Sequence, residues 1–287
     1  MESAPRPYRS VLYIPGSKER ALEKAKTLPV DAIIFDLEDA VTPEEKPAAR
    51  DMLAATLGAG GYGNRAQIVR VNGMDTEWGR ADLQAIAAIG PEAVLLPKVN
   101  GPADIAAVAQ MLDAVPAAAH TTIWAMMETP EGILNAAAIA RAPRMAGFVM
   151  GTNDLAKELG SRTRAAMLTA LQHCLLAARA AGIVCVDGVY NAFKDEDGLA
   201  AECAEGRDFG FDGKTLIHPA QVEIANAAFA PSEAEIDLAR RQIAAFEAAE
   251  AEGQGVAVVD GKIVENLHVA TARKTLARAD AIAKGAA

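Results

Sequence analysis

The stretch TTIWAMMETPEGI, residues 121–133, decides the fold of this chain of 287 residues. Its first part is a near-continuous apolar run, which is typical of a parallel strand that is buried on both faces. Glu128 ends the run, and the next residues predict a helix start, with Thr129 as N-cap and Pro130 at the first helical position. A strand that passes directly into a helix is the repeating unit of parallel α/β folds.

Seven further segments repeat this pattern of a short apolar run followed by a helix-length segment. Eight such units predict an α/β fold of the TIM (β/α)8 barrel type. The alternative is a doubly wound open sheet, but no G-x-G-x-x-G follows the first run and no P-loop pattern occurs. The predicted strands are residues 10–16, 31–39, 66–73, 93–99, 121–128, 145–151, 183–189 and 212–218.

Capping boxes predict where two of the helices begin. Ser232 and Glu235 stand at the required spacing in front of an amphipathic segment. Thr42 and Glu45 stand at the same spacing, although Pro47 conflicts with a helix that begins at Thr42.

The last part of the chain departs from the repeat. After the helix that Ser232 caps, the Asp-Gly pair at residues 260–261 predicts a hairpin, and a last helix follows it. We therefore expect a catalytic barrel over residues 1–230 and a C-terminal helix–hairpin–helix extension over residues 231–287.

Composition limits the classes of partner. The formal net charge is −10, which disfavours nucleic acid and anionic membrane surfaces because both require a basic face. No apolar run approaches the ~20 residues that span a bilayer, and the N-terminus lacks the apolar core of a signal peptide. The three cysteines, Cys174, Cys185 and Cys203, form no CxxC motif and indicate buried thiols in a reducing compartment. We therefore expect a cytoplasmic protein with a small-molecule partner.

Polar and ionisable residues recur at the C-terminal ends of the predicted strands, where TIM barrels carry their active sites. For any single position, a structural ion pair or a solvated loop residue is the preferred interpretation. The recurrence on consecutive strands favours a functional site. The residues are Glu38, Asp39, Arg70, Asn72, Lys98, Glu128, Asp154, Asp187 and His218.

Glu128 and Asp154 follow neighbouring predicted strands, and two carboxylates at one barrel mouth repel unless a cation lies between them. Mg²⁺ is commonly held by one or two carboxylates. The four histidines show no metal-site spacing, which disfavours zinc. We interpret His218 as a positioning hydrogen-bond residue, with a catalytic role as the alternative. Arg70 lies inside an apolar strand and needs an anion, either a substrate carboxylate or the nearby Glu38 or Asp39.

Seven motifs resemble those of the HpcH/HpaI aldolase and citrate lyase β-subunit family, and more narrowly its CitE-like acyl-CoA lyases, which include malyl-CoA and citramalyl-CoA lyases. The resemblance covers nearly the whole chain, from Arg9 to the final hairpin, with the motifs in the family order. The motifs are RSVLYIPGSKERALEKA, DAIIFDLEDAV, VRVN, LLPKV, METPEGI, GTNDL and LIHPAQV.

The resemblance implies a TIM barrel whose C-terminal extension packs on a neighbouring subunit of a homotrimer or homohexamer. It implies Mg²⁺ as cofactor and a coenzyme A thioester as substrate. Glu128 and Asp154 match the Mg²⁺ ligands, and Arg70 matches the arginine that binds the substrate carboxylate. The positions at which relatives contact coenzyme A are Tyr13, Arg20 and Lys24. For the two basic residues, an ordinary solvated helix face is the alternative.

One position departs from the family pattern. The family's catalytic carboxylate is an Asp in a tail motif like G-K-M-[IV]-D-x-P, which reaches into the next subunit's site. This chain has GKIVENLH, with Glu265 at that position and no proline after it. Glutamate keeps the carboxylate but adds a methylene, and a displacement of about 1 Å can cost roughly a hundredfold in rate. Glu265 is therefore either a working acid/base or a mark of altered or lost lyase activity.

The activity that the resemblance implies is a Mg²⁺-dependent carbon–carbon lyase. It would cleave or form a 3-hydroxyacyl-CoA such as malyl-CoA or citramalyl-CoA, with acetyl-CoA and a 2-oxo acid as the other partners of the reaction. Arg70 would stabilise the developing negative charge, and Glu265 would protonate the enolate of acetyl-CoA. Three alternatives remain open: a malyl-CoA-type thioesterase, an aldolase that acts without coenzyme A, and a citrate lyase β subunit that depends on an acyl carrier.

Overall fold

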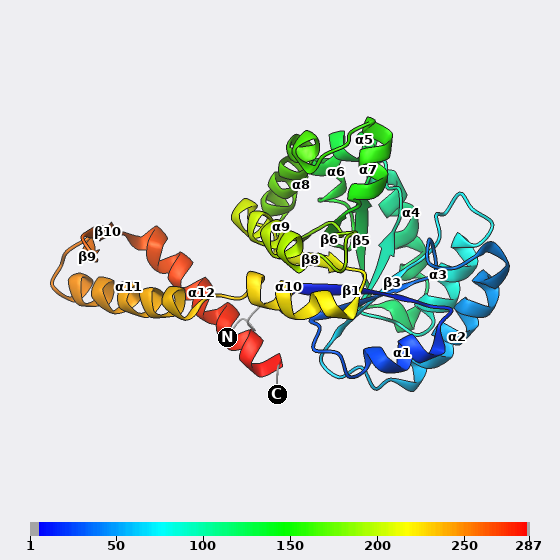
Figure 1. The fold of residues 1–287 in the computed structure, drawn as a ribbon, viewed down its shortest axis with the longest axis horizontal. Coiled ribbons are helices and arrows are strands. Elements are labelled where there is room, and N and C mark those ends of the chain that lie inside the picture. Colours follow the sequence, from blue (N-terminus) through cyan, green and yellow to red (C-terminus); the bar gives the residue numbers. More distant parts are fainter. Residues whose placement is uncertain (1–5, 286–287) are drawn as a thin grey trace. The chain divides into compact units, whose positions relative to one another are not determined.

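The computed structural model describes residues 6–285, which divide into two compact units. The first unit spans Tyr8–Ala228, and residues 229–285 belong to the second. Within the first unit, eight parallel strands close into a barrel, because each strand pairs with the next and β1 pairs with β8 (Figure 1). The predicted TIM-barrel class is confirmed.

All eight predicted strands are present, and most end before the loop residues that the predictions had included. The apolar part of each run is the paired part, whereas the polar residues after it turn into the barrel mouth. The strands are β1 (Ser10–Pro15), β2 (Ala32–Asp36), β3 (Ala66–Arg70), β4 (Ala93–Leu96), β5 (Thr122–Met127), β6 (Met145–Met150), β7 (Val184–Asp187) and β8 (Gly213–Leu216).

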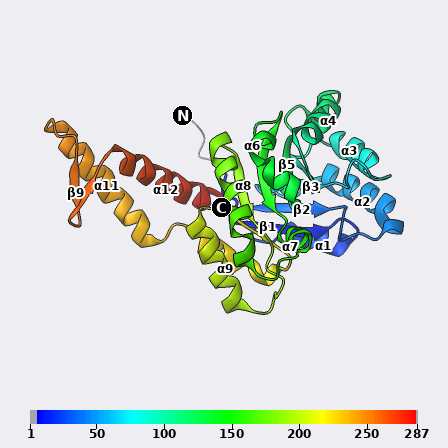
Figure 2. The ribbon, with the colours of Figure 1, turned by 90° about the horizontal axis from the view of Figure 1, so that it is seen from above.

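Helices surround this barrel and connect its strands (Figures 1 and 2). Four short 3-10 turns (Pro43–Glu45, Pro116–Ala118, Arg164–Met167 and Pro219–Gln221) lie among them. The helices of the barrel unit are α1 (Glu19–Ala25), α2 (Lys46–Ala59), α3 (Gly79–Ala87), α4 (Pro102–Asp113), α5 (Pro130–Leu134), α6 (Ala136–Ile139), α7 (Thr152–Leu159), α8 (Leu168–Ala181), α9 (Glu196–Phe209) and α10 (Val222–Phe229), whose last residue falls in the second unit.

The two predicted helix starts in this unit have different outcomes. Thr129 caps α5 as expected, since its hydroxyl accepts a hydrogen bond from the amide of Gly132 at 3.0 Å. The capping box predicted at Thr42 is wrong, because the Thr42 side chain makes no capping bond. A 3-10 turn follows Thr42 and α2 begins only at Lys46, which places Pro47 in the first helical turn, where a missing amide hydrogen costs little.

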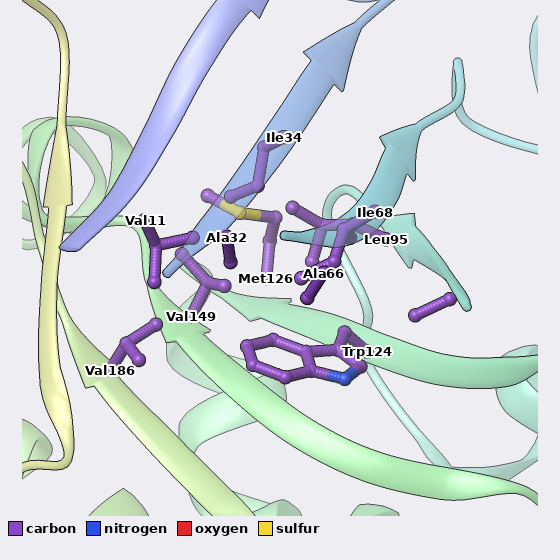
Figure 3. Packing of buried hydrophobic residues seen from close by; sticks show 11 residues of the cluster. Val11, Ala32, Ile34, Ala66, Ile68, Leu95, Trp124, Met126, Val149 and Val186 are labelled. Atoms are coloured by element: carbon purple, nitrogen blue, oxygen red, sulfur yellow. The ribbon is translucent and has the colours of Figure 1, made fainter. Parts of the chain in front are cut away.

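The barrel interior is filled by alternating strand residues rather than left as a pore (Figure 3). Trp124 is its largest member, and a side chain at Gly147 on the neighbouring strand would overlap the indole ring. The cluster comprises Val11, Ala32, Ile34, Ala66, Ile68, Ala93, Leu95, Trp124, Met126, Val149 and Val186. Because strand residues alternate, the position two residues after each of these also points inward.

The second unit contains the helix, hairpin and helix that the sequence predicts. They are α11 (Glu233–Ala251), β9 (Ala257–Val259), β10 (Lys262–Val264) and α12 (Asn266–Gly285). The Ser232–Glu235 capping box is present, and the hairpin turns at Asp260 and Gly261 with φ of 49° and 73°. A small apolar cluster of Ala249, Ala257, Val264 and Val269 joins these elements.

Two expectations from composition concern burial and membranes. The three cysteines are buried and free, as predicted. Among residues 6–285, the structure contains no helix that combines the length and the apolar character needed to cross a bilayer.

Candidate active site

A pocket of about 330 Å³ opens at the C-terminal ends of the barrel strands. Its deep polar residues follow from strand alternation: Asp36 comes two residues after Ile34, and Glu128 two after Met126. The lining comprises Tyr13, Pro15, Asp36, Asp39, Ala40, Arg70, Met126, Glu128, Met150, Gly151, Thr152, Asn153, Asp154, Val189, Asn191, Thr215 and Ile217.

Arg70 is buried in this pocket and is surrounded by carboxylates. Its Nε and Nη2 donate to the two oxygens of Asp36, at 2.7 and 2.6 Å. Its Nη1 lies 2.8 Å from Glu38 Oε2 and 3.0 Å from Asp39 Oδ2. Both carboxylates that the sequence offered as partners therefore contact Arg70. The strongest partner, Asp36, was missed, although its position in the alternation of β2 would have indicated it.

Tyr13 forms the wall beside this arginine. The Arg70 guanidinium carbon lies 5.0 Å from the centre of the tyrosine ring, within the range of a cation–π interaction. The phenol donates to Met126 Sδ at 3.4 Å, and burial raises the pKa of Tyr13 above its ordinary value. Tyr13 therefore stays neutral and packs against the charged arginine.

Glu128 is the most deeply buried carboxylate on the opposite wall, with 2% of its surface exposed. Its Oε1 accepts a hydrogen bond from the Lys98 amide at 2.7 Å, and its carboxylate lies over the Cα of Gly151, where any Cβ would collide with it. Burial, assisted by the charges of Glu38 and Asp154, raises the pKa of Glu128 from 4.5 to about 7. The hydrogen bond from the Lys98 amide and the charge of Arg70 favour the ionised form, but they do not offset its burial.

Asp154 supplies a second carboxylate from the first turn of α7 and lines the same pocket. Four carboxylates line the pocket (Asp36, Asp39, Glu128 and Asp154), with one guanidinium between them. Such an excess of hard oxygen donors fits Mg²⁺, which binds through one or two carboxylates and retains water. The described part of the chain holds no group of three or more His, Cys, Asp or Glu side chains suited to a metal. The protein's share of such a site would be Glu128 and Asp154.

Lys98 joins the two walls of the pocket. Its amide donates to Glu128, and its ammonium lies 3.0 Å from Glu38 Oε1. Because Glu38 contacts Arg70 through its other oxygen, the interactions form one chain from Glu128 to Arg70.

Three residues from the predicted ring at the strand ends have structural roles outside the pocket lining. Asp187 points away from the barrel interior, where it pairs with Arg164 and with the buried Lys214 at 2.9 Å. Asn72 donates to the buried Asp82 at 2.6 Å. The ring of His218 accepts from the Ala220 amide and caps a 3-10 turn, which is a positioning role.

The three residues predicted to contact coenzyme A are spread over two elements. Tyr13 lies in the pocket, whereas Arg20 and Lys24 lie on the exposed face of α1, outside the pocket lining. Glu265 belongs to the second unit, where it is exposed and lies directly before α12. Its amide donates to His268 Nδ1 at 3.0 Å.

The fold and the pocket define a TIM-barrel protein whose mouth combines an anion-binding arginine with carboxylates suited to a divalent cation. Residues 9–219 match the HpcH/HpaI aldolase/citrate lyase family, and the chain belongs to this family. The predicted resemblance is confirmed.

Two relatives and one solved structure show which members of the family this chain resembles. The chain is 68% identical over 280 residues to a (3S)-malyl-CoA thioesterase from Cereibacter sphaeroides, which covers 96% of both chains. It is 37% identical over 281 residues to the citrate lyase subunit beta of Escherichia coli, which covers 95% of this chain and 93% of the relative. A crystal structure of CitE from Mycobacterium tuberculosis, in complex with magnesium, acetoacetate and coenzyme A, matches with a TM-score of 0.79 and 30% identity. That match covers 96% of this chain and 99% of CitE.

Proposed function

We propose that this protein is a Mg²⁺-dependent enzyme that hydrolyses malyl-CoA or a closely related coenzyme A thioester. The observation that carries the proposal is the pocket of Arg70, Glu128 and Asp154, in a chain 68% identical to a (3S)-malyl-CoA thioesterase over nearly its whole length. The sequence placed lyase activity first and hydrolysis second. The 68% identity to a thioesterase, against 37% to citrate lyase subunit beta, favours hydrolysis over the lyase reaction.

In this proposal Glu128 and Asp154 hold the magnesium ion. The bound metal would polarise a substrate oxygen as a Lewis acid. The protein's own contribution is to hold both carboxylates in place, with Glu128 fixed by the Lys98 amide and by the close approach of Gly151. The structural neighbour from Mycobacterium tuberculosis contains magnesium, which supports magnesium as the metal.

Arg70 binds the free carboxylate of the malyl group. Its Nε–Nη2 edge is held by Asp36, and its Nη1 contacts Glu38 and the more exposed Asp39, so a substrate carboxylate would bind at Nη1 by displacing one of these two carboxylates. A planar guanidinium fixed at one edge presents its remaining donors in a defined direction, which suits a carboxylate. Arg20 and Lys24 on α1 would attract the phosphates of coenzyme A.

We assign the general base to Glu265 of a neighbouring subunit in a homotrimer or homohexamer. Glu265 takes a proton from water as the water oxygen bonds to the thioester carbonyl carbon. The carbon–sulfur bond then breaks, and the proton passes to the leaving thiolate, which gives free acid and coenzyme A. The longer side chain of glutamate, compared with the family's aspartate, suits a base that reaches a water molecule instead of the enolate carbon.

The second candidate is the lyase reaction, favoured by the 37% identity to citrate lyase subunit beta. A base would take the proton of the 3-hydroxyl group while the carbon–carbon bond breaks. The products would be a 2-oxo acid and the enolate of acetyl-CoA, which Glu265 would protonate.

One assay separates these reactions. The purified chain is incubated with Mg²⁺ and malyl-CoA or citramalyl-CoA, and free thiol and 2-oxo acid are measured together. Free thiol without 2-oxo acid supports hydrolysis. A 2-oxo acid with little free thiol supports the lyase instead. The absence of both products would contradict both activities and favour a subunit that depends on an acyl carrier or a different substrate.

A further inference from the structure

Lys98 lies between β4 and α4 in a backbone conformation that lysine rarely adopts. Its φ is 50°, in the left-handed region where the Cβ of any residue except glycine crowds the backbone. Such strain persists only where the surrounding structure fixes the backbone, and it concentrates at functional sites. Lys98 therefore needs a local cause for its conformation.

The turn after β5 supplies that cause. The Lys98 amide donates to Glu128 Oε1 at 2.7 Å. Two residues further along the same loop, Asn100 is held by the Thr129 hydroxyl at 2.6 Å and by the Asn135 side-chain amide at 2.8 Å. The loop is therefore bound at both ends to the segment that carries Glu128, and the left-handed residue directs its amide toward that carboxylate.

The side chain of Lys98 contacts the other wall of the pocket. Its ammonium lies 3.0 Å from Glu38 Oε1, and Glu38 Oε2 lies 2.8 Å from Arg70 Nη1. The Lys98 side chain is 56% exposed, whereas that of Glu38 is only 11% exposed. Without the ammonium, Glu38 would be a nearly buried anion beside the arginine edge that receives the substrate. Glu38 already contacts Nη1, and without the ammonium it would compete more strongly with the substrate carboxylate for that nitrogen.

We propose that Lys98 is a positioning residue with two separable roles. Its left-handed backbone fixes Glu128 for the metal ion, and its ammonium neutralises Glu38 so that Arg70 retains its attraction for the substrate carboxylate. The inference rests on the proposed function, because it takes Glu128 as a metal ligand and Arg70 as the carboxylate-binding residue. Each role changes a different measured quantity.

The ammonium role is tested with Lys98→Met, which keeps an unbranched side chain, one atom shorter, and removes the charge. We expect the KM for malyl-CoA to rise roughly two- to fivefold, which corresponds to the energy of a partly exposed ion pair. The rise should be smaller at high salt, because salt screens the pair. The dissociation constant for Mn²⁺, measured by electron paramagnetic resonance, should stay unchanged. Lys98→Arg should restore the KM. An unchanged KM in Lys98→Met overturns this role.

The backbone role is tested with Lys98→Val and Lys98→Gly, which both lack the ammonium but differ in their tolerance of positive φ. We expect Lys98→Val to raise the Mn²⁺ dissociation constant about tenfold, and Lys98→Gly to bind as the wild type does. If Lys98→Val does not fold, Lys98→Thr, which is also β-branched, takes its place and is expected to change the affinity in the same direction. Equal Mn²⁺ affinity in Lys98→Val and Lys98→Gly overturns the role.

Arg144 provides a control for a general loss of stability, because Arg144→Val adds strain and also removes the ion pair of Arg144 with Asp113. It also has a positive φ, 61°, and it lies outside the pocket lining. Arg144→Val should leave Mn²⁺ affinity unchanged, and an equal loss there would mean that Lys98 acts only through general stability. Mn²⁺ binding is read without turnover. A failure of the proposed reaction would appear in the product assay, whereas a failure of this inference would appear in the metal affinities.

Discussion

Arg70 and Asp36 form a two-point ion pair inside the barrel mouth, with N–O distances of 2.7 and 2.6 Å. Their side chains are 8% and 2% exposed, so neither charge is solvated well without the other. The pair occupies one edge of the guanidinium and leaves the Nη1 edge to Glu38 and Asp39. Asp36 therefore determines which donors of Arg70 face the pocket.

Asp36→Asn should lower both stability and substrate affinity. Removing one partner of a buried ion pair costs about 3 kcal/mol, because the other charge remains desolvated. We expect a loss of that size in the free energy of unfolding, measured with urea, together with a raised KM for malyl-CoA.

Asp31→Asn is the matched control. Arg9 and Asp31 form the same two-point pair, at 2.9 and 2.7 Å, but they lie outside the pocket lining. The control should lose comparable stability and keep its KM. An equal rise in KM for both variants would contradict the role of Asp36 in orienting Arg70.

Glu128→Gln should stabilise the metal-free protein at alkaline pH. The pKa of Glu128 is raised from 4.5 to about 7, so the folded state binds the proton more tightly than the unfolded chain does. Stability is therefore lost as the pH rises through this window, by about 3 kcal/mol once Glu128 is ionised. Glutamine removes this cost and still accepts the Lys98 amide. In urea titrations with EDTA, we expect the variant to exceed the wild type at pH 8 and to match it at pH 4, below the unfolded-chain pKa of 4.5. A less stable variant at pH 8 would contradict the prediction.

Binding of Mg²⁺ should weaken as the pH falls through the same window. The metal requires ionised Glu128, so protons compete with it. With a pKa of about 7, the apparent dissociation constant should rise about tenfold between pH 8 and pH 6. Isothermal titration calorimetry at the two pH values measures this change. Equal affinity at both would show that Glu128 is not the ligand that controls binding.

The barrel could be predicted because its strands are buried on both faces. A segment such as residues 121–128 is therefore apolar throughout, and its end is marked by a capped helix start. The polar ends of the strands were also located correctly. Their orientation was harder to predict, since a displacement of one residue moves a side chain from the pocket to the outer wall.

Asp36 and Asp187 show what that displacement means. Each is the last residue of its strand, but Asp36 lies in register with inward-facing Ile34, whereas Asp187 follows inward-facing Val186. Asp187 therefore binds Lys214 behind the sheet, and Asp36 binds Arg70 inside the barrel. The left-handed backbone of Lys98 left no local signal, because contacts from another loop produce it.

Gly151→Ala should weaken metal binding. A Cβ at this position would collide with the Glu128 carboxylate and lie 3.0 Å from the Met126 methyl group. We expect at least a tenfold loss in Mg²⁺ affinity and a stability loss of about 1–3 kcal/mol.

Gly58→Ala is the matched control for that substitution. Gly58 lies within α2, where an added Cβ meets nothing within 4 Å. The control should gain about 0.5–1 kcal/mol from the loss of backbone freedom in the unfolded chain and should keep its Mg²⁺ affinity. Unchanged Mg²⁺ affinity in Gly151→Ala would show that Glu128 can bind from another position.

Glu265 should act in a site that it shares with another subunit. If the site combines Arg70 of one subunit with Glu265 of the next, then Arg70→Ala and Glu265→Ala oligomers are each inactive for different reasons. Random mixing of the two variants gives about one site in four with both residues intact, because each is supplied independently with a probability of about one half. We therefore expect mixed oligomers, refolded or co-expressed at equal ratio, to recover about a quarter of wild-type malyl-CoA turnover. Light scattering gives their subunit number. A mixture that remains inactive while forming the same oligomer would place both residues in one chain's site, and an active Glu265→Ala oligomer would remove Glu265 from the reaction.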